Sequence, residues 1–469
     1  MKFALLNPNW DFAGSTYFGC RDPHTPLELL FAAAKVRQAG HDALVIDAQT
    51  GNLTIEDVRS QLRGFTADFL VIPSAPSYLF WRCPPPELRI PQQWFAGIGG
   101  AARKVLIGPH ASATPATAMR KTGADIALRG EPDQAIADLA SKPREQIDGC
   151  CWRDEDGAGS PANAGFLPQR IESHDSLGPP VAFAGVTEHM SPTLGVVDMS
   201  TLGALDFQDY QVEAHSHRHH VFWGEGRGAE LEFARGCPWA CTFCNKTLFR
   251  NKFRERKVEE VLREVDLLVA RGVDYIYFID EIFGVGKNVR RLLEGLAERN
   301  VQIGFQTRID LWNEETLDLL GRAHTISIEC GVESITDSGR NELNKNCRMS
   351  TERITELLIY AKQRIAWVQA NLILTAHDDR AEIHRWQERL KTHGVWVSEP
   401  VPMFPFPGSP LYVQTFGALP DDMAWERAHQ HYTSTFSGQD YSDIQEQRPL
   451  PLEQLEGTTL EKEERTTGK

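Results

Sequence analysis

The sequence lacks the features that mark membrane proteins and nucleic-acid-binding proteins. No apolar run approaches the ~20 residues that a helix needs to cross a bilayer, and the apolar start of the chain is too short for a signal peptide. Positive charge is scarce: 49 lysines and arginines stand against 64 aspartates and glutamates, a net charge of −15. Such a chain is poorly suited to neutralise phosphates. We therefore expect no membrane span and no nucleic-acid partner.

Cysteines in a pattern that suggests disulfides are also lacking. The chain has nine cysteines, an odd number, and three of them stand close together. Cys150 and Cys151 are adjacent, and we predict that both are free thiols. This usage indicates a reducing compartment, hence a cytoplasmic protein. With 469 residues, 41% of them hydrophobic and 24% charged, the chain is otherwise typical of a globular protein of two or three domains.

Strand and helix patterns alternate over residues 1–145, the first predicted domain. The clearest helix spans residues 26–39 and stops at Gly40. Strands are predicted at residues 3–7, 43–47, 68–73, 104–108 and 124–128. This alternation predicts a doubly wound parallel sheet, whose ligands bind beyond the carboxyl ends of the strands. No G-x-G-x-x-G follows the first strand, which disfavours a dinucleotide. The candidate ligand-binding residues at these strand ends are Asn7, Ser74, Tyr78, Gly108, His110, Gly130 and Glu131.

The segment with the clearest chemistry is RGCPWACTFCN, residues 235–245. Cys237, Cys241 and Cys244 are spaced C-x3-C-x2-C, directly after an alternating apolar run at 229–233 that predicts a strand. Three thiolates on one short loop can bind three irons of a cubane cluster and leave the fourth iron open. A zinc site would need a fourth protein ligand, and none stands at the usual spacing nearby. Three small buried cysteines in a core are the plain alternative, which the intervening Gly and Pro disfavour.

Strand and helix patterns alternate again over residues 229–412. Helices are predicted around 258–269, 289–300, 314–322, 352–364 and 381–393, and further strands at 275–279, 302–306, 325–330, 367–375 and 395–398. About six strand–helix units predict a partial (β/α)6 barrel, in which chemistry belongs at the carboxyl ends of the strands. Residues 146–228 predict a linker with a short hairpin, and residues 413–469 a C-terminal segment. The fold class is therefore α/β, a doubly wound parallel sheet followed by a partial barrel.

At the cysteine motif, with Phe243 directly before the third cysteine, the chain resembles the radical S-adenosylmethionine (SAM) superfamily. The resemblance implies that Cys237, Cys241 and Cys244 hold a [4Fe-4S] cluster whose open iron chelates SAM. Reduction then cleaves SAM to methionine and a 5′-deoxyadenosyl radical.

Four successive strand ends of the barrel carry polar residues that match the superfamily by position. The resemblance implies that Asp280 and Glu281 receive the SAM ammonium and that Arg308 pairs with the SAM carboxylate. Glu333 and Ser334 would suit the ribose hydroxyls or the amino group. Each of these residues alone would more simply be a solvated strand end. Their joint placement is what favours a binding site.

The first half resembles the cobalamin-binding domain fused to many radical SAM enzymes. The resemblance rests on Gly-Pro-His after the fourth strand and Arg-Gly-Glu after the fifth, with FIDEIF, GVES and PFPGSPLY in the second half. His24 stands in the D-x-H position of mutase-type cobalamin folds, but Leu27 replaces a glycine needed for close approach. We therefore predict a loop histidine before a helix rather than a cobalt ligand. Tyr78, Trp81 and Arg82 are the candidates for the lower corrin face, with a plain apolar patch as the alternative.

Two departures from that branch concern the substrate. Glu281 stands where the branch often has aspartate, and residues 375–379 replace its G-x-P-G-x-T segment. We expect the loop after the fifth barrel strand to be specialised, with Asn371, His377 and Glu399 on the substrate surface.

The resemblance implies a cobalamin-dependent radical SAM enzyme. Its commonest chemistry is methyl transfer to an unactivated carbon: the deoxyadenosyl radical removes a hydrogen atom and methylcobalamin supplies the methyl group. Three alternatives remain: a non-methylating rearrangement, cyclisation or oxidation; a radical SAM enzyme without cobalamin; and a cobalamin-binding sensor without catalysis. The implied partners are a small-molecule substrate, whether secondary metabolite, lipid or saccharide, and an electron donor such as flavodoxin or ferredoxin.

Two other features are interpreted as structural. The histidine-rich run at 215–220 lacks carboxylate or cysteine support, so we favour a solvated loop over a metal site. Cys330 and Cys347 lack partners at a ligand spacing, so we predict no second cluster.

Overall fold

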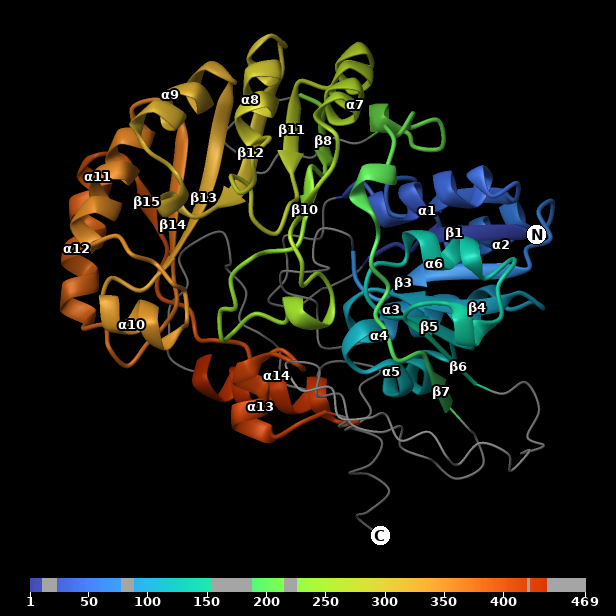
Figure 1. The fold of residues 1–469 in the computed structure, drawn as a ribbon. Helices are drawn as coiled ribbons and strands as arrows, with labels where there is room; N and C mark the ends of the chain where they lie inside the picture. The colour runs from blue at the N-terminus through green and yellow to red at the C-terminus, as the bar shows by residue number, and fades with distance from the viewer. Residues whose placement is uncertain (11–22, 77–87, 154–187, 215–225, 420–421, 437–469) are drawn as a thin grey trace.

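The computed structural model describes residues 1–10, 23–76, 88–153, 188–214, 226–419 and 422–436. Figure 1 shows two sheets side by side, one formed by the first third of the chain and one by its second half. None of the helices in these ranges is long and apolar enough to cross a membrane. Tyr78, Trp81, Arg82 and the histidine-rich run at 215–220 lie outside the described residues.

The first sheet has seven strands in the order β2-β1-β3-β4-β5-β6-β7. Five are parallel, and their central run follows the flavodoxin-like order, which places the ligand site between β1 and β3. The predicted doubly wound parallel sheet is thereby confirmed. The parallel strands are β1 (Lys2–Asn7), β2 (Asp42–Asp47), β3 (Phe69–Pro73), β4 (Arg103–Ile107) and β5 (Ile126–Leu128).

The sheet continues beyond residue 145 into the segment expected to be a linker. β6 (Cys150–Arg153) and β7 (Glu188–Met190) pair antiparallel with each other, and β6 pairs antiparallel with β5. They add an antiparallel pair of strands to the edge of the sheet, where Cys150, Cys151 and Trp152 bury their side chains in the core. Residues 154–187, which separate the two strands in the sequence, lie outside the described residues, so the expected short hairpin stays a prediction.

Helices cover both faces of this sheet. The helices are α1 (Leu27–Gln38), α2 (Ile55–Leu62), α3 (Arg89–Ile98), α4 (Pro109–Ala113), α5 (Pro115–Thr122) and α6 (Asp133–Asp138). Thr54 and Asp57 close a capping box at the start of α2. Gly123 ends α5 in the left-handed conformation that glycine adopts readily.

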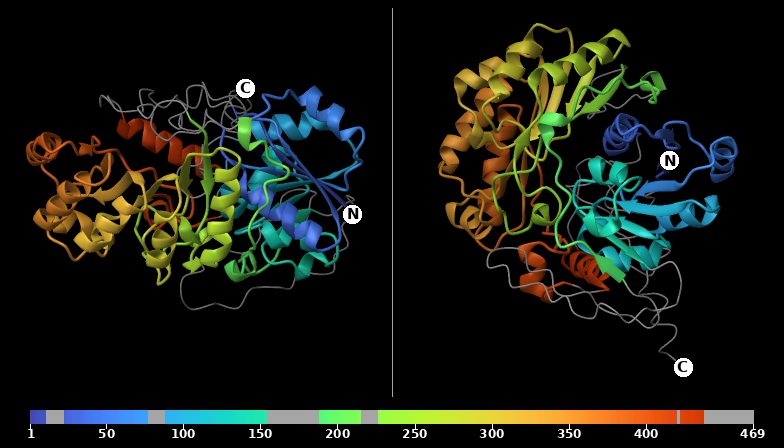
Figure 2. Two further views of the ribbon diagram at one scale, coloured as in Figure 1. Left: turned by 90° about the horizontal axis from the view of Figure 1, so that it is seen from above. Right: turned by 45° about the vertical axis from the view of Figure 1, so that its right-hand side comes forward.

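The second sheet is the predicted partial barrel. Its six strands lie in the order β15-β14-β13-β12-β11-β8, and every neighbouring pair is parallel. Figure 2 shows the sheet curving like an open barrel with its helices outside. The strands are β8 (Gly228–Leu231), β11 (Tyr275–Phe278), β12 (Gln302–Thr307), β13 (Thr325–Glu333), β14 (Trp367–Leu372) and β15 (Trp396–Val397). The helices are α7 (Val258–Ala270), α8 (Val289–Ala297), α9 (Glu314–Arg322), α10 (Asp337–Glu342), α11 (Thr351–Lys362) and α12 (Arg380–Thr392).

The end of the described chain joins the two sheets. The helices α13 (Pro410–Phe416) and α14 (Ala424–Phe436), red in Figure 2, lie where the barrel meets the first sheet. They form a second apolar core with Ala113 from α4 and with Phe404 and Phe406 from the barrel's last loop. Trp425 is buried in this core.

Candidate functional site

The cysteine loop leaves the carboxyl end of β8 and is closed at its base by a small ribbon. The short strands β9 (Ala234–Arg235) and β10 (Arg254–Glu255) pair antiparallel, so residues 236–253 form one excursion. Gly236 has a φ of +86°, and a Cβ there would lie 2.1 Å from the Lys252 carbonyl oxygen. Only glycine fits this position without moving the return strand.

Contacts from the turn after α10 and from α13 (Pro410–Phe416) fix the loop. The Thr242 amide donates to the Leu343 carbonyl at 3.1 Å, and the Asn344 Nδ2 donates to the Ala240 carbonyl at 2.7 Å. The Leu411 amide donates to the Thr242 carbonyl at 2.9 Å. These three hydrogen bonds therefore position the loop backbone against its neighbours.

The three cysteines are free thiols, and each is partly exposed. Burial raises the pKa of all three, that of Cys244 to about 12, while the nearby cations of Lys246, Arg308 and Lys345 act in the opposite direction. Among the described residues, no three His, Cys, Asp or Glu side chains converge on a point where they could hold one metal ion. A cubane cluster does not require such convergence, because each thiolate binds a different iron. The donor set fits a cluster with cationic surroundings.

Asp280 and Glu281 follow β11, and both of them brace the cysteine loop. Asp280 is buried and accepts the Phe233 amide at 2.8 Å and the Ala234 amide at 2.9 Å. Glu281 accepts the Gly236 amide at 2.8 Å and pairs with Arg250 at 3.1 Å. Burial raises the pKa of both carboxyls, that of Asp280 well above its usual range. Their role toward the SAM ammonium stays a prediction.

Arg308 lies at the end of β12 and faces the cysteine loop. Its Nε and Nη2 donate to the Asp310 carboxylate at 2.9 and 2.6 Å, and its Nη1 donates to the Lys345 carbonyl at 2.8 Å. Its guanidinium lies 4.3 Å from the ring centroid of Trp239, between the first two cysteines. Burial acts to raise the pKa of Asp310, but Arg308 outweighs it and holds that pKa below its usual value. Arg308 keeps further donors for a carboxylate ligand.

Glu333 ends β13 in an unusual backbone conformation. Its φ is +68°, and the pairing of β13 with β14 shifts register between Gly331 and Glu333. The carboxylate turns back over Gly331, whose Cβ would lie 2.4 Å from it, and pairs with Lys345 at 3.0 Å. Backbone strain of this kind is concentrated at functional sites.

Ser334 is buried and faces the next loop. Its hydroxyl donates to Asp378 at 2.8 Å, and the same carboxylate accepts the Thr336 amide at 3.1 Å and the Thr375 hydroxyl at 2.8 Å. Asp378 thus joins the ends of β13 and β14. These hydrogen bonds hold residues 375–379 in place, although the segment lacks the glycines and the proline of the G-x-P-G-x-T segment that it replaces.

The expected substrate residues lie around the same edge. The Asn371 Oδ1 accepts from Gln369 at 2.7 Å on β14, and its side chain is half-buried. His377 and Glu399 are exposed; His377 pairs with Glu342 at 3.2 Å and Glu399 accepts from Gln387 at 3.3 Å.

The first-sheet candidates form two groups at the carboxyl ends of its strands. The Asn7 side chain donates to Asp47 at 2.8 Å and accepts from Trp10 Nε1 at 2.8 Å. His110, beyond Gly108 with its φ of +99°, is buried; its Nδ1 lies 3.2 Å from the Ser74 hydroxyl. The His110 ring packs on Trp425, with ring centroids 4.1 Å apart, so α14 covers this strand end.

Gly130 and Glu131 contact protein rather than an open edge. A Cβ on Gly130 would lie 2.4 Å from the Gly195 carbonyl oxygen, and the two glycines form a bridge. Glu131 is buried, accepts the Val197 amide at 2.8 Å and pairs with Arg254. Their expected contact with cobalamin stays a prediction, and in this structure they anchor the segment that leads into the barrel.

His24 connects the two halves of the chain. It is buried just before α1, and its Nδ1 lies 2.8 Å from the Glu230 carboxylate on β8. The other oxygen of Glu230 accepts the Thr25 amide at 2.8 Å. His24 therefore lies in a loop directly before a helix, as we predicted from the sequence.

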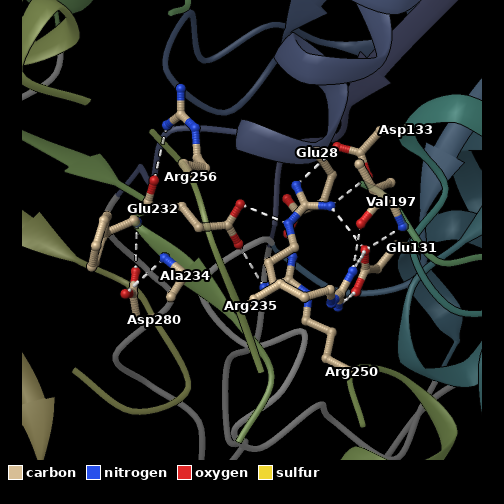
Figure 3. Close-up of polar contacts among 12 residues, drawn as sticks. Glu28, Glu131, Asp133, Val197, Glu232, Ala234, Arg235, Arg250, Arg256 and Asp280 are labelled. Carbon is tan, nitrogen blue, oxygen red and sulfur yellow. Dashed lines mark hydrogen bonds and ion pairs between the residues drawn. The ribbon is translucent and has the colours of Figure 1, made fainter. Parts of the chain in front are cut away.

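A buried ion-pair network fixes the cysteine loop against the first sheet, as Figure 3 shows. Arg235 donates to both Asp133 oxygens at 2.7 and 2.9 Å and to Glu232 at 2.8 Å. Arg250 bonds Glu232 at 2.6 Å and lies 3.5 Å from Glu28 in α1. Burial acts to raise the pKa values of Asp133 and Glu232, but the arginines hold both below their usual range. We call this network, with Arg254 and Glu131, the interdomain lock.

Of the residues of the lock, sequence reasoning singled out only Glu131, and it did so as a candidate ligand-binding residue. Its signal was present: two glutamates interrupt the apolar run of β8, and arginines stand on both sides of the cysteine motif. Asp310, Lys345 and Lys246 were also missed, because each stands in a loop without a motif of its own.

Comparison with known proteins places the second half of the chain in a family. The sequence profile of the Radical SAM superfamily matches residues 231–386, from the end of β8 to α12. The chain contains a radical SAM domain. Its radical SAM domain therefore includes the three cysteines and all four strand ends described above.

Two curated relatives resemble more of the chain. An uncharacterized methyltransferase of Pyrococcus horikoshii is 25% identical over 71% of this chain and 66% of the relative. The anaerobic magnesium-protoporphyrin IX monomethyl ester cyclase of Cereibacter sphaeroides is 20% identical over 88% of this chain and 63% of the relative. The chain thus spans just under two thirds of the length of these two relatives.

Two solved structures share the fold. The methyltransferase TsrM from Kitasatospora setae, with cobalamin and a [4Fe-4S] cluster bound, has a TM-score of 0.62 at 14% identity and covers 88% of this chain and 77% of its own. The cobalamin-dependent radical enzyme OxsB, with aqua-cobalamin and SAM bound, has a TM-score of 0.61 at 15% identity and covers 95% of this chain and 63% of its own. The resemblance to cobalamin-fused radical SAM enzymes is confirmed at the level of the fold.

Proposed function

We propose that this chain is a cobalamin-dependent radical SAM methyltransferase that acts on an unactivated carbon of a small molecule. One observation carries the proposal: the interdomain lock fixes the cysteine loop against the doubly wound sheet. A radical reaction that uses two cofactors needs the substrate held between them in one geometry. A rigid junction of this kind supplies that geometry.

Some residues of the site would bind the cluster and SAM, and others position the cysteine loop. Cys237, Cys241 and Cys244 would hold the [4Fe-4S] cluster, which supplies the electron that cleaves SAM. Arg308 would offer its remaining donors to the SAM carboxylate, and Glu333 would accept from SAM hydroxyl or amino groups. Asp280 and Glu281 keep the loop backbone in place through the amides that they accept.

The first sheet would hold cobalamin, whose methyl group is the one transferred. Its carboxyl edge presents Asn7, Ser74 and His110, which are buried and oriented by neighbouring side chains. The candidates for the lower corrin face remain Tyr78, Trp81 and Arg82. The related TsrM was solved with cobalamin and, separately, with tryptophan substrate, which supports a small-molecule substrate here.

The proposal is tested anaerobically with the full chain. The protein is reconstituted with iron, sulfide and hydroxocobalamin, then given a strong one-electron reductant and methyl-deuterated SAM. We expect mass spectrometry to find the deuterated methyl group on cobalamin, with 5′-deoxyadenosine appearing when a substrate is present. Labelled methyl groups that never leave SAM, with cobalamin bound, would refute methyl transfer.

A second candidate is a non-methylating cobalamin-dependent reaction such as ring closure. The likeness to the magnesium-protoporphyrin cyclase over 88% of this chain favours it as the alternative. It predicts 5′-deoxyadenosine without transfer of the label. An electron donor of the flavodoxin or ferredoxin class is part of either proposal.

A further inference from the structure

A short turn after α10 contacts the cysteine loop, Arg308 and Glu333 of the candidate SAM site. The Leu343 carbonyl accepts the Thr242 amide and the Asn344 side chain bonds Ala240, both in the cysteine loop. The Lys345 carbonyl accepts from Arg308 at 2.8 Å, and its ammonium pairs with Glu333 at 3.0 Å. We call residues 343–346 the anchoring turn. No family motif used above includes it.

The backbone of the anchoring turn is strained in a regular way. Asn344 has a φ of +49° and Asn346 a φ of +52°, on either side of Lys345. Asparagine tolerates this left-handed region better than other residues with a side chain. The paired partner of Lys345, Glu333, is left-handed as well. Left-handed residues on both sides of the Lys345–Glu333 ion pair indicate that the position of this pair serves a function besides packing.

Lys345 is a buried cation beside the cluster loop. Its side chain is only 4% exposed. Its charge acts to lower the pKa of the Cys241 thiol and that of Cys330, against the larger effect of burial. A buried ammonium this close to a cluster ligand interacts with the cluster charge through a medium of low dielectric constant.

We propose that Lys345 is a positioning residue that tunes the cluster's reduction potential and orients Glu333 for SAM. The inference rests on the proposed function in assigning the cluster to the three cysteines and a SAM contact to Glu333. In the step concerned, a donor of the flavodoxin or ferredoxin class gives up one electron and the oxidised cluster accepts it, with no bond or proton exchanged. The reduced cluster carries one more negative charge, which the ammonium stabilises.

Opposite substitutions at Lys345 and Glu333 test the sign of the effect on the reduction potential of the cluster. Lys345→Met removes a positive charge while keeping the apolar stem, so reduction becomes harder. Glu333→Gln removes the compensating negative charge, so reduction becomes easier. A residue that merely supports the fold would shift the potential in one direction for both changes, or not at all.

The experiment uses the full chain reconstituted with iron and sulfide alone, so cobalamin and methyl transfer do not enter. Redox titration followed by electron paramagnetic resonance measures the reduced fraction of the cluster, and equilibrium dialysis measures SAM binding. At a fixed potential we expect Lys345→Met to lower the reduced-to-oxidised ratio about tenfold, which is a shift of about 59 mV for one electron. Glu333→Gln should raise the ratio, and Lys345→Arg should stay near wild type. Both Lys345→Met and Glu333→Gln should weaken SAM binding about tenfold, because each breaks the ion pair that holds residue 333.

Lys391→Met is the matched control. That lysine is exposed and pairs only loosely with Glu388 at 3.5 Å, so neither measurement should change. If Lys345→Met does not fold, Glu333→Gln alone decides the sign. Equal reduction potentials in wild type, Lys345→Met and Glu333→Gln would overturn the inference. Wild-type protein that binds no iron or sulfide would instead refute the cluster assignment.

Discussion

Gly236 is the residue on which the cysteine loop depends most directly. Its φ of +86° and the nearby Lys252 carbonyl leave no room for a side chain. We predict that Gly236→Ala abolishes cluster assembly, measured as iron and sulfide content and visible absorbance after reconstitution. Gly417→Ala is the matched control: its φ is +95° with nothing near the Cβ, so it should cost about 1–2 kcal/mol of stability. Equal cluster content in the two variants would contradict the assignment.

Cys150 and Cys151 give a pH-dependent test at the residue scale. Burial raises the pKa of each thiol to about 12, from a model-peptide value of 9.0. Because the thiolate is the nucleophile, alkylation by iodoacetamide at pH 8 should be about 10³–10⁴-fold slower than for a free cysteine. Peptide mapping by mass spectrometry checks this, with guanidinium-unfolded protein as the fully labelled control.

The same shift has a defined sign for stability. A thiol whose pKa is higher in the folded state than in the unfolded state contributes stability that is complete below pH 9. That contribution is lost as the pH rises from 9 toward 12. Unfolding in denaturant at pH 8 and pH 10 should therefore show a lower midpoint at pH 10.

The elements themselves were largely predictable from local patterns. The parallel strands of the first sheet and five of the barrel helices lie within a few residues of their predicted ranges, because apolar periodicity and glycine stops are local features of the sequence. The short helix α10 was not predicted. The ion-pair partners of buried charged residues were not predictable in this way. Glu230 and Glu232 break the pattern of β8, but His24 and Arg250 stand 206 and 18 residues from them. The sequence indicates that such charges are buried, but it does not indicate which residue of opposite charge pairs with each of them.

The same limit applied to the site. The cysteines and the four strand ends followed from spacing and topology. The orientation of each side chain did not, because Asp280 and Glu281 turn toward backbone amides that only the folded loop brings near.

α14 is an element whose role can be tested through one side chain. Trp425 packs on His110 and donates from Nε1 to the Thr114 hydroxyl at 3.0 Å. Trp425→Ala should destabilise the protein by about 3–5 kcal/mol. Trp425→Phe keeps a ring and loses one hydrogen bond, so it should cost about 1 kcal/mol. Chemical denaturation measures both. Equal losses would mean that the ring contact with His110 contributes nothing.

At the scale of the whole molecule, the interdomain lock should dominate stability at the junction. Asp133→Asn leaves Arg235 buried without its full partner, which should cost about 3–5 kcal/mol of unfolding free energy. The pKa of Asp133 lies below its usual value, so its contribution is present above about pH 4 and lost as the pH falls further. Arg389→Gln breaks an exposed pair with Glu352 and should cost about 0–1 kcal/mol. Urea titrations of both variants at pH 7 and pH 4 provide the comparison, and similar losses at pH 7 would contradict a dominant lock.

The lock also constrains the order in which the chain can fold during synthesis. Glu28, Glu131 and Asp133 belong to the first sheet, yet their arginine partners are made 100 or more residues later. Until Arg250 and Arg254 leave the ribosome, the nascent first sheet must either keep these carboxylates hydrated or take up protons. The first sheet is therefore not an excisable module. A fragment that ends before the cysteine loop should be expressed only as a loosely packed species, and pausing of translation should be best tolerated after residue 255.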